Sequence, residues 1–248
     1  MIDSCIHFEK NNIKYIRKIS KDLLSKGITC ALSIFDNENT LANREQFKEN
    51  CKKFRNLLPV ALIRNTKDLN SEFNHIKKLK YKFIKIHPRI LKTELKNQSF
   101  YIQVFKKIKK TKLNVLWCTF DGWKNKASET NQLEFLSKLI NLIPQNKIIL
   151  MHGGGPNLLK FYEKFRFLNN VFLDLSYTLV QYQRTTLEKD IIFLMKKFDK
   201  RIIVGCDYPT FNLNTYLPIL KRLLKISKIN KNKKKNILKN NLQKIING

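Results

Sequence analysis

Three of the four histidines in the chain stand at or just after the ends of short apolar runs. These are His7, His87 and His152, and Asp207 follows a fourth run in the same way. Imidazole and carboxylate groups exchange protons near neutral pH, and both bind divalent metal ions. The four residues are therefore candidates for acid–base or metal-assisted chemistry, whereas His75 falls in a segment of helical period and is interpreted as structural.

Residues next to these side chains indicate how a substrate could be held. The Gly153–Gly155 run follows His152 directly, and Arg89 lies two residues after His87. A glycine backbone lets amide N–H groups approach an anion or a carbonyl oxygen, and a guanidinium group pairs with a carboxylate. The glycines are equally compatible with a tight turn before Pro156, where a helix is expected to begin.

The order of the segments predicts an α/β fold. Apolar, β-branched runs alternate with segments of helical period, and no linker rich in Pro, Gly or Ser separates them. Candidate strands begin near Ile2, Ile28, Leu58, Phe83, Asn114, Lys147, Val171 and Arg201. Clear helical stretches are Ile13–Lys26, Asn70–Lys80, Gln132–Leu142 and Lys189–Phe198. Eight strand–helix units in 248 residues are typical of a single (β/α)8 TIM barrel over residues 1–248, with a doubly wound open sheet as the alternative.

A barrel would bring the candidate residues together. In this fold the active site lies at the C-terminal ends of the strands. His7, His87, His152 and Asp207 all fall at such ends, so we expect their side chains to converge at one mouth of the barrel. A single histidine at a strand end is most often a hydrogen-bonded structural group, and it is the convergence that favours a functional site.

Composition excludes several classes of protein. Hydrophobic residues make up 43% and charged residues 27%, which is ordinary for a globular domain and excludes a disordered or fibrous chain. No apolar run reaches the ~18–20 residues that span a bilayer, and the N-terminus lacks a signal peptide pattern. Five scattered cysteines without CxxC spacing argue against a disulfide scaffold. We therefore expect a cytoplasmic protein.

The formal net charge of +30 raises nucleic acid or an anionic membrane as a partner. Lysine greatly outnumbers arginine, however, and arginine pairs best with phosphate and guanine. The dense block Lys231–Lys235 lies in a segment of helical period and is interpreted as a solvated face. We expect a small-molecule substrate, no specific nucleic acid and no membrane partner.

Four motifs, in chain order, resemble those of the amidohydrolase-related (amidohydrolase 2-like) TIM-barrel family of metal-dependent hydrolases. They are Ile2–Phe8, Ile84–Arg89, Met151–Gly154 and Val204–Pro209. The segment Asn236–Leu242 is similar to the closing helix of that family. The resemblance therefore extends from one end of the chain to the other.

The resemblance implies a metal site at the barrel mouth. Members of the family carry two histidines on strand 1, one on strand 5, one on strand 6 and an aspartate on strand 8, around one or two divalent metals. The matching positions in this chain are Cys5, His7, Cys118, His152 and Asp207. Thiols thus stand where two of the histidines are expected. His87 and Arg89 match a strand-4 motif that lies near the substrate in many relatives.

The two thiols change the expected chemistry. Imidazole ligands with one carboxylate leave Zn2+ net positive, whereas Cys5 and Cys118 thiolates with Asp207 make the site net negative and the metal a poorer Lewis acid. One relative, the pyrone-dicarboxylate lactonase, hydrolyses its substrate without metal. We therefore expect one divalent metal, with zinc the best match, or none. Three outcomes stay open: a zinc site with altered chemistry, a metal-free hydrolase, or a binding protein without catalysis.

The predicted function is hydrolysis of a small polar substrate at a C–N or lactone C–O bond. Asp207 would act as general base on the attacking water, and His152 would polarise the scissile carbonyl group. Substrate contacts are expected from His87, Arg89, Gly153, Gly154, Trp123 and Tyr177. The alternative is a decarboxylase-like or purely ligand-binding barrel with a degraded metal site.

Overall fold

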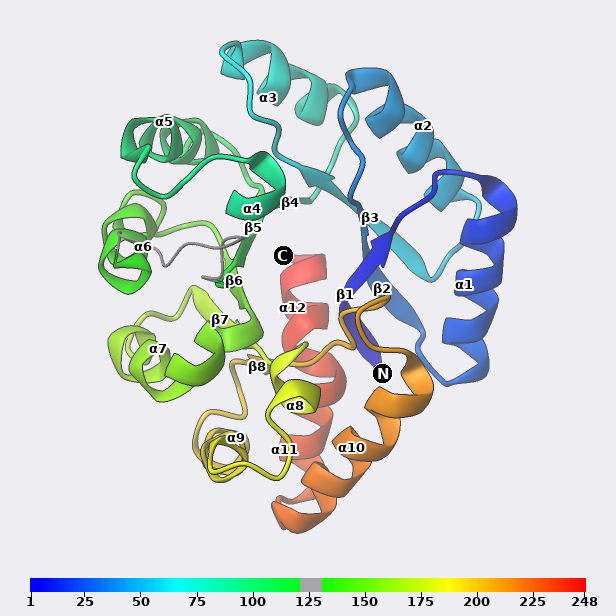
Figure 1. The fold of residues 1–248 in the computed structure, drawn as a ribbon, viewed down its shortest axis with the longest axis vertical. Coiled ribbons are helices and arrows are strands. Elements are labelled where there is room, and N and C mark those ends of the chain that lie inside the picture. The colour runs from blue at the N-terminus through cyan, green and yellow to red at the C-terminus, as the bar shows by residue number, and fades with distance from the viewer. Residues whose placement is uncertain (121–130) are drawn as a thin grey trace.

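The computed structural model describes residues 1–120 and 131–248, and in them it confirms the predicted (β/α)8 barrel. Eight parallel strands follow one another around the barrel in chain order (Figure 1). They are β1 (Ile2–Phe8), β2 (Cys30–Phe35), β3 (Leu57–Leu62), β4 (Phe83–Ile86), β5 (Asn114–Cys118), β6 (Ile148–Met151), β7 (Val171–Asp174) and β8 (Ile202–Ile203). A bridge between Ile6 and Tyr208 joins the chain after β8 to β1, and the His7 amide donates to the Tyr208 carbonyl at 2.7 Å.

Helices surround the barrel on its outside (Figure 1). The longer ones are α1 (Ile13–Ser25), α2 (Leu41–Lys52), α3 (Leu69–Lys78), α5 (Gln98–Ile108), α6 (Gln132–Asn141), α7 (Leu158–Phe165), α9 (Leu187–Lys197) and α10 (Leu213–Ile226). Polar side chains begin several of them: Asn12, for example, accepts the Tyr15 amide at 2.8 Å and so satisfies a donor that the first turn of α1 would leave free. Short elements follow the strands at the C-terminal end of the barrel, namely α4 (Pro88–Leu91), the 3-10 segment η1 (His152–Asn157) and α8 (Thr178–Gln181).

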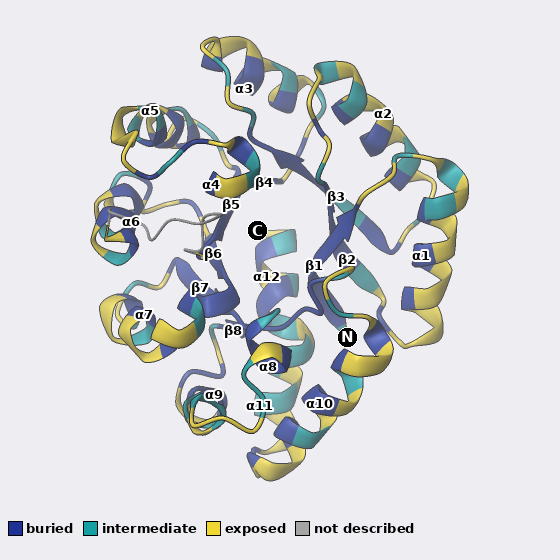
Figure 2. Ribbon diagram, viewed as in Figure 1, coloured by how far each residue is buried: buried dark blue, intermediate teal, exposed yellow. Residues whose placement is uncertain are grey.

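Two apolar layers hold the barrel together. Leu32, Val60 and Leu116 belong to a cluster inside the barrel, whereas their strand neighbours pack outward against the helices. Figure 2 shows the strands buried and the outer faces of the helices exposed. Successive side chains of a strand point to opposite faces of the sheet, and here the barrel interior covers one face and the helices cover the other.

The last segment of the chain covers the N-terminal end of the barrel. It comprises α11 (Lys231–Lys235), the π-helical turn η2 (Asn236–Asn240) and α12 (Asn241–Asn247). Leu242 and Ile245 join the inner cluster, and the Asn114 side chain, at the start of β5, donates to the Ile245 carbonyl at 3.3 Å. The opposite end of the barrel, where the strands terminate, is therefore the end left for a site.

A few boundaries differ from those expected. The strand expected near Ile28 begins at the half-buried Cys30, because the Ile28 amide still donates a hydrogen bond to the carbonyl of Leu23 at the end of α1. The regular helix expected at Pro156 begins at Leu158, after η1. Among the described residues, no helix has both the length and the apolar composition needed to cross a bilayer.

Candidate active site

The candidate residues meet in a pocket of about 370 Å³ at the C-terminal end of the barrel. Its lining includes His7 of β1, Cys118 of β5, and His87, His152 and Asp207, which follow β4, β6 and β8. All five residues are at most 9% exposed, so their side chains interact mainly with one another. The structure thus brings five predicted site residues, from five strands, into one buried mouth.

Strand alternation determines which side chains enter this mouth. On β4, Ile84 and Ile86 pack in the outer apolar layer, whereas Phe83 belongs to the inner cluster. Lys85 shares the parity of Phe83, and its side chain accordingly lies inside the barrel, fully buried. His87, two residues further, lines the pocket above it.

Three pocket residues have a left-handed backbone that residues with a Cβ rarely adopt: φ is 66° at His152, 62° at Tyr177 and 59° at Asp207. Neighbouring groups hold His152 on both sides. Its amide donates to Asp174 Oδ2 at 3.2 Å, and the Thr178 hydroxyl donates to its carbonyl at 2.7 Å. Strained backbone that the surroundings enforce is typical of positions where side-chain direction matters for function.

One group of polar side chains surrounds the Lys85 ammonium. Its Nζ lies 2.7 Å from His7 Nε2 and 3.8 Å from Cys5 Sγ. His7 Nδ1 is bonded to the Asp36 carboxylate, so this nitrogen carries the imidazole proton and Nε2 accepts from Lys85. Asp207 completes the group by accepting from Cys5 Sγ at 3.1 Å.

Electrostatics fix the charges in this group. Burial lowers the pKa of His7, and the Lys85 charge lowers it further, so the imidazole is neutral. Burial also opposes the charged form of Lys85, but the acidic groups around it, Cys5, Cys118, Asp207 and Asp36, outweigh burial and raise its pKa. Lys85 is therefore a permanent cation inside the barrel.

Asp207 is a carboxylate for the same reason. Burial alone would raise its pKa, but the neighbouring basic groups of His152, His7 and Lys85 and the Cys5 hydrogen bond lower it below the ordinary value. Cys5 responds in the opposite sense: burial and the nearby Asp207 charge raise the pKa of its thiol well above the ordinary value. Cys5 is therefore a neutral donor to an ionised Asp207.

Cys118 belongs to a second group, with His87 and His152. Burial would raise the pKa of its thiol, but the neighbouring imidazoles of His87 and His152 lower it well below the ordinary value. In turn, burial lowers the pKa of His152, and the bond to Cys118 and its charge more than offset this, so that the pKa of His152 is raised. Each of these two residues thus favours the charged form of the other.

The metal implied by the motifs can be tested against these donors. Donor atoms of Cys5, His7 and Asp207 lie within 4.8 Å of one another and form a possible site for a divalent ion. The Lys85 ammonium, however, already uses the His7 lone pair that would bind the ion, and its charge would repel a cation. With Lys85 in this place the donor set does not fit a metal. The other two expected ligands, Cys118 and His152, interact electrostatically with each other instead.

The three consecutive glycines are explained by space and backbone conformation. Gly153 and Gly154 have φ of 58° and 87°, and a Cβ on Gly154 would lie 2.2 Å from the Phe161 ring. The Gly154 amide, expected to face a ligand, donates to Thr119 Oγ1 at 2.9 Å. Only glycine satisfies both the left-handed conformation and this close approach.

The remaining predicted substrate contacts lie at the pocket rim or beyond the described residues. Arg89 is exposed, lines the pocket and places its guanidinium carbon 4.7 Å from the centre of the Phe120 ring. Tyr177 also lines it, with its ring 5.6 Å from that of His152. Trp123 lies outside the described residues.

Sequence reasoning missed two residues of this mouth, Lys85 and Asp36. A lysine between two isoleucines in an otherwise apolar strand, two positions before His87, was the signal for the first. Asp36 is the first polar residue after the apolar run of β2, the same position that pointed to the histidines. Strand parity accounts for Lys85, and the position at a strand end accounts for Asp36.

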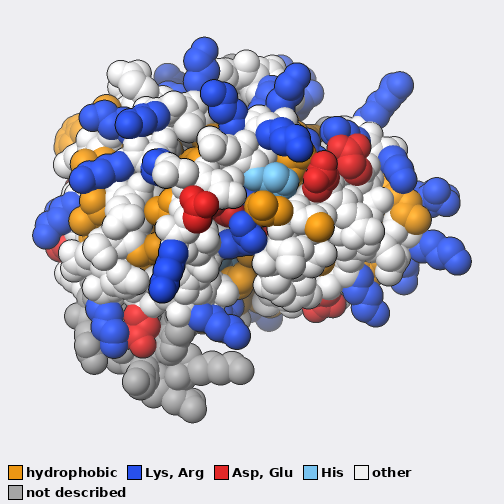
Figure 3. Space-filling view, turned by 90° about the horizontal axis from the view of Figure 1, so that it is seen from above, with side chains coloured by type: hydrophobic (Ala, Val, Ile, Leu, Met, Phe, Trp, Pro, Cys, Tyr) orange, Lys and Arg blue, Asp and Glu red, His pale blue; other side chains and the backbone are white. Residues whose placement is uncertain are grey.

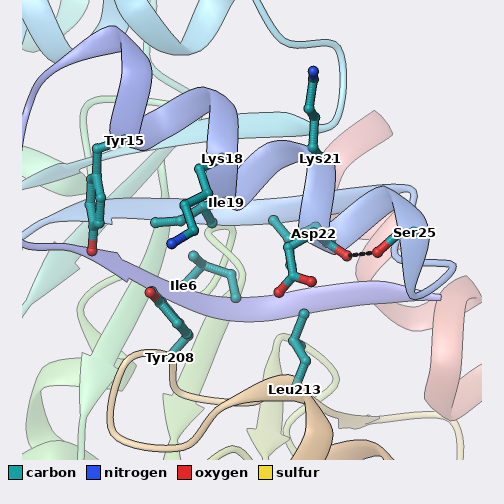
Figure 4. A pocket seen from close by; sticks show the side chains of 10 residues that line it. Ile6, Tyr15, Lys18, Ile19, Lys21, Asp22, Ser25, Tyr208 and Leu213 are labelled. Atoms are coloured by element: carbon teal, nitrogen blue, oxygen red, sulfur yellow. Dashed lines mark hydrogen bonds between the residues drawn. The ribbon is translucent and has the colours of Figure 1, made fainter.

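Other surfaces carry less chemistry. A second pocket, of about 430 Å³, lies on the outside of the barrel between α1 and the segment after β8, where the hydroxyls of Tyr15 and Tyr208 approach each other (Figure 4). Its lining of apolar side chains, lysines and Asp22 includes none of the candidate catalytic residues. Figure 3 shows lysine and arginine side chains spread over the viewed face rather than gathered into one patch.

Comparison with known protein families and with curated proteins gives no match. Solved structures do match over the whole chain. A TIM-barrel protein from Bordetella bronchiseptica, described as uncharacterized, has 14% identity and a TM-score of 0.77, covering 100% of this chain and 98% of that one. A probable 2-pyrone-4,6-dicarboxylic acid hydrolase from Acinetobacter baumannii, with citric acid bound, has 14% identity and a TM-score of 0.65, covering 100% and 99%. Dihydroorotase from Campylobacter jejuni has 14% identity and a TM-score of 0.65, covering 100% and 83%. The chain therefore has the TIM-barrel fold of these proteins.

Proposed function

We propose that this chain is a hydrolase of the amidohydrolase-related family that cleaves a C–N or lactone C–O bond in a small polar substrate. The observation that carries the proposal is a carboxylate, Asp207, and an imidazolium, His152, on the lining of one buried pocket. Similar structures support the substrate class, because two of them are described as a pyrone-dicarboxylic acid hydrolase and a dihydroorotase. The compounds in those names are rings that carry carboxylates.

The two residues divide the work of hydrolysis. The ionised Asp207 takes a proton from water as the oxygen attacks the carbonyl carbon. His152 Nδ1 faces the Ser176 carbonyl at 3.1 Å, so Nε2–H is the proton that faces Cys118 in the free protein and donates to the substrate's carbonyl oxygen once a substrate is bound. Lys85 keeps Asp207 ionised, and it supplies the positive charge that a metal would otherwise bring to this mouth.

The pocket favours a small substrate that bears a carboxylate. Its volume, about 370 Å³, lies at the lower end of the range for small-molecule sites. Arg89 at the rim presents a guanidinium group, which pairs with a carboxylate through two parallel hydrogen bonds. A substrate held there would direct its scissile bond toward the buried end of the pocket.

Hydrolysis of a panel of carboxylated lactones and cyclic amides tests this proposal. Asp207→Asn should lower kcat by about 10²–10⁴-fold, the usual contribution of a general base. Glu9→Gln is the matched control, because Glu9 is an exposed carboxylate on the same pocket lining, and it should leave kcat unchanged. Binding of panel compounds without turnover would instead establish a ligand-binding barrel, and equal turnover in wild type and Asp207→Asn would exclude Asp207 as the base.

A further inference from the structure

A third cavity lies at the N-terminal end of the barrel, the end opposite the candidate active site. Its volume is about 660 Å³, larger than that of the active-site pocket and within the usual range for small-molecule sites. Four segments form its walls: α3, the turn before β4 (residues 80–82), the segment that enters β5 (residues 110–114) and the end of α12 with the residue after it (residues 245–248). The lining includes none of the candidate catalytic residues.

Strand pairing and hydrogen bonds join these walls to one another. Phe83 of β4 pairs with Asn114 of β5, and the Asn114 amide donates to the Lys82 carbonyl at 3.0 Å. Neighbouring strands lie ~4.8 Å apart, so the two turns lie side by side. Lys82 Nζ donates to the Ile246 carbonyl at 3.0 Å. Asn114 Nδ2 donates to the Ile245 carbonyl at 3.3 Å, so the last turn of α12 is bonded to both segments.

The lining is basic and contains no acidic side chain. Five of its fourteen residues are lysines, whereas lysine and arginine together are 49 of the 248 residues of the chain. All five are exposed, and none of them forms an ion pair with a carboxylate among the described residues. Glu94 is the one acidic residue between residues 73 and 120, and residues 208–248 contain none. The five lysines are Lys77, Lys80, Lys82, Lys110 and Lys112.

Apolar side chains form the buried part of the lining. Four of them are at most 8% exposed, namely Phe73, Tyr81, Leu113 and Ile245. The Tyr81 hydroxyl donates to the Arg44 carbonyl at 3.2 Å, so the polar end of this side chain is already bonded and its ring adds apolar surface. Sites for organic ligands combine such surface with a few charged groups that fix the orientation of the ligand. The cavity therefore favours a molecule with an apolar part and several negative charges.

Phosphate groups match the lysines better than a single carboxylate does. A phosphate monoester carries about 1.5–2 negative charges at neutral pH and three acceptor oxygens. Lysine binds phosphate as a point charge on a flexible stem, so several exposed lysines can reach one chain of phosphates. A single carboxylate would leave most of the five ammonium groups without a counter-charge.

We propose that this cavity binds a small organic polyphosphate, with its phosphates on the five lysines and its apolar body on the buried floor. The site lies at the other end of the barrel from the proposed hydrolase site, and the proposal does not depend on the proposed function. The volume of the cavity matches a small molecule rather than a nucleic acid strand.

Titration calorimetry with three probes, at low salt and with a chelator present, tests the proposal. ATP carries phosphates and an aromatic body, tripolyphosphate carries the charge alone, and adenosine carries the body alone. We expect ATP to bind at one site per chain, tripolyphosphate to bind about tenfold more weakly or worse, and adenosine not to bind. Absence of ATP binding at millimolar concentration, or equal affinity for ATP and tripolyphosphate, would overturn the proposal.

Two double variants separate the cavity from the general positive charge of the chain. Lys80→Gln with Lys112→Gln removes two lysines of the lining and should weaken ATP binding by about tenfold. Lys231→Gln with Lys235→Gln is the matched control, because it removes two exposed lysines of α11, outside the cavity, and gives the same net charge. The control should bind ATP as wild type does. Equal losses of affinity in the two variants would overturn the proposal.

A short single-stranded DNA provides the remaining comparison. We expect the DNA to bind more weakly than ATP and to leave the Lys80→Gln, Lys112→Gln variant and its control indistinguishable. Binding of the DNA that is lost in that variant alone, without binding of ATP to wild type, would identify a nucleic-acid surface and overturn the proposal.

Discussion

Lys85 determines whether the donors at the barrel mouth can hold a metal, and its replacement by methionine tests this directly. Zinc binds imidazole nitrogen at about 2.0–2.1 Å, whereas Lys85 Nζ lies 2.7 Å from His7 Nε2. An ion on that lone pair would therefore sit about 0.7 Å from the ammonium nitrogen, which is impossible. Zinc can bind only if Lys85 leaves its place.

If the Lys85 side chain moved aside, its positive charge would still repel a divalent metal ion. At about 4 Å and an effective dielectric constant near 20, two unit charges interact by about 4 kcal/mol, so an ammonium repels a divalent ion by about 8 kcal/mol. That repulsion weakens binding by about 10⁵-fold or more. Lys85→Met keeps most of the side-chain volume and removes both the overlap and the charge.

Zinc content after dialysis and zinc titration calorimetry give the readout. We expect no stoichiometric zinc in wild type and about one zinc per chain in Lys85→Met, held by the three donors that lie within 4.8 Å of one another. Lys48→Met, which removes a largely buried lysine that lies over the Tyr81 ring, is the control and should behave as wild type. Wild type that retains one zinc per chain through dialysis would refute the reasoning, as would equal zinc affinity in wild type and Lys85→Met.

Four further outcomes are expected. Arg44→Met removes a fully buried guanidinium from between two buried glutamates and should lower the free energy of unfolding by about 3–5 kcal/mol in urea titrations. Gly154→Ala places a Cβ 2.2 Å from the Phe161 ring and should cost about 1–3 kcal/mol in the same assay. The pKa of His152 is raised from 6.5 to about 9, so its imidazolium contributes its full stability below pH 6.5, and this contribution is lost as the pH rises through about 9. Urea titrations between these pH values should show the free energy of unfolding fall, and the rate of hydrolysis should fall over the same alkaline range. Any binding to DNA should be weak and fade steeply with salt in filter-binding assays, and sequence-selective binding that persists at about 0.2 M salt would contradict this.

The barrel and its mouth follow from patterns that the sequence displays openly. Buried parallel strands are short apolar runs, and the residue that ends each run must face the same end of the barrel. His7, His152 and Asp207 could therefore be placed together before their contacts were known. The same rules applied more strictly, to every strand end and to strand parity, would also have found Asp36 and Lys85.

The division of the mouth into two groups could not be predicted. Whether Cys118 meets Asp207 or His152 depends on side-chain directions across neighbouring strands, and these are set by local backbone such as the left-handed conformation at His152 and Asp207. Nothing in residue type or spacing encodes that conformation for a histidine or an aspartate. The ligand set suggested by resemblance therefore combined residues that belong to two groups of contacts in one pocket.

The charge states of Cys5 and Cys118 show why that division matters for chemistry. The resemblance implies that both are thiolates which bind a metal together with Asp207. In the structure Cys5 lies beside the Asp207 carboxylate, which keeps its thiol protonated, while Cys118 lies beside two imidazoles, which favour its thiolate. Only one thiolate then stands in the mouth, and it faces a proton donor instead of a cluster of metal ligands.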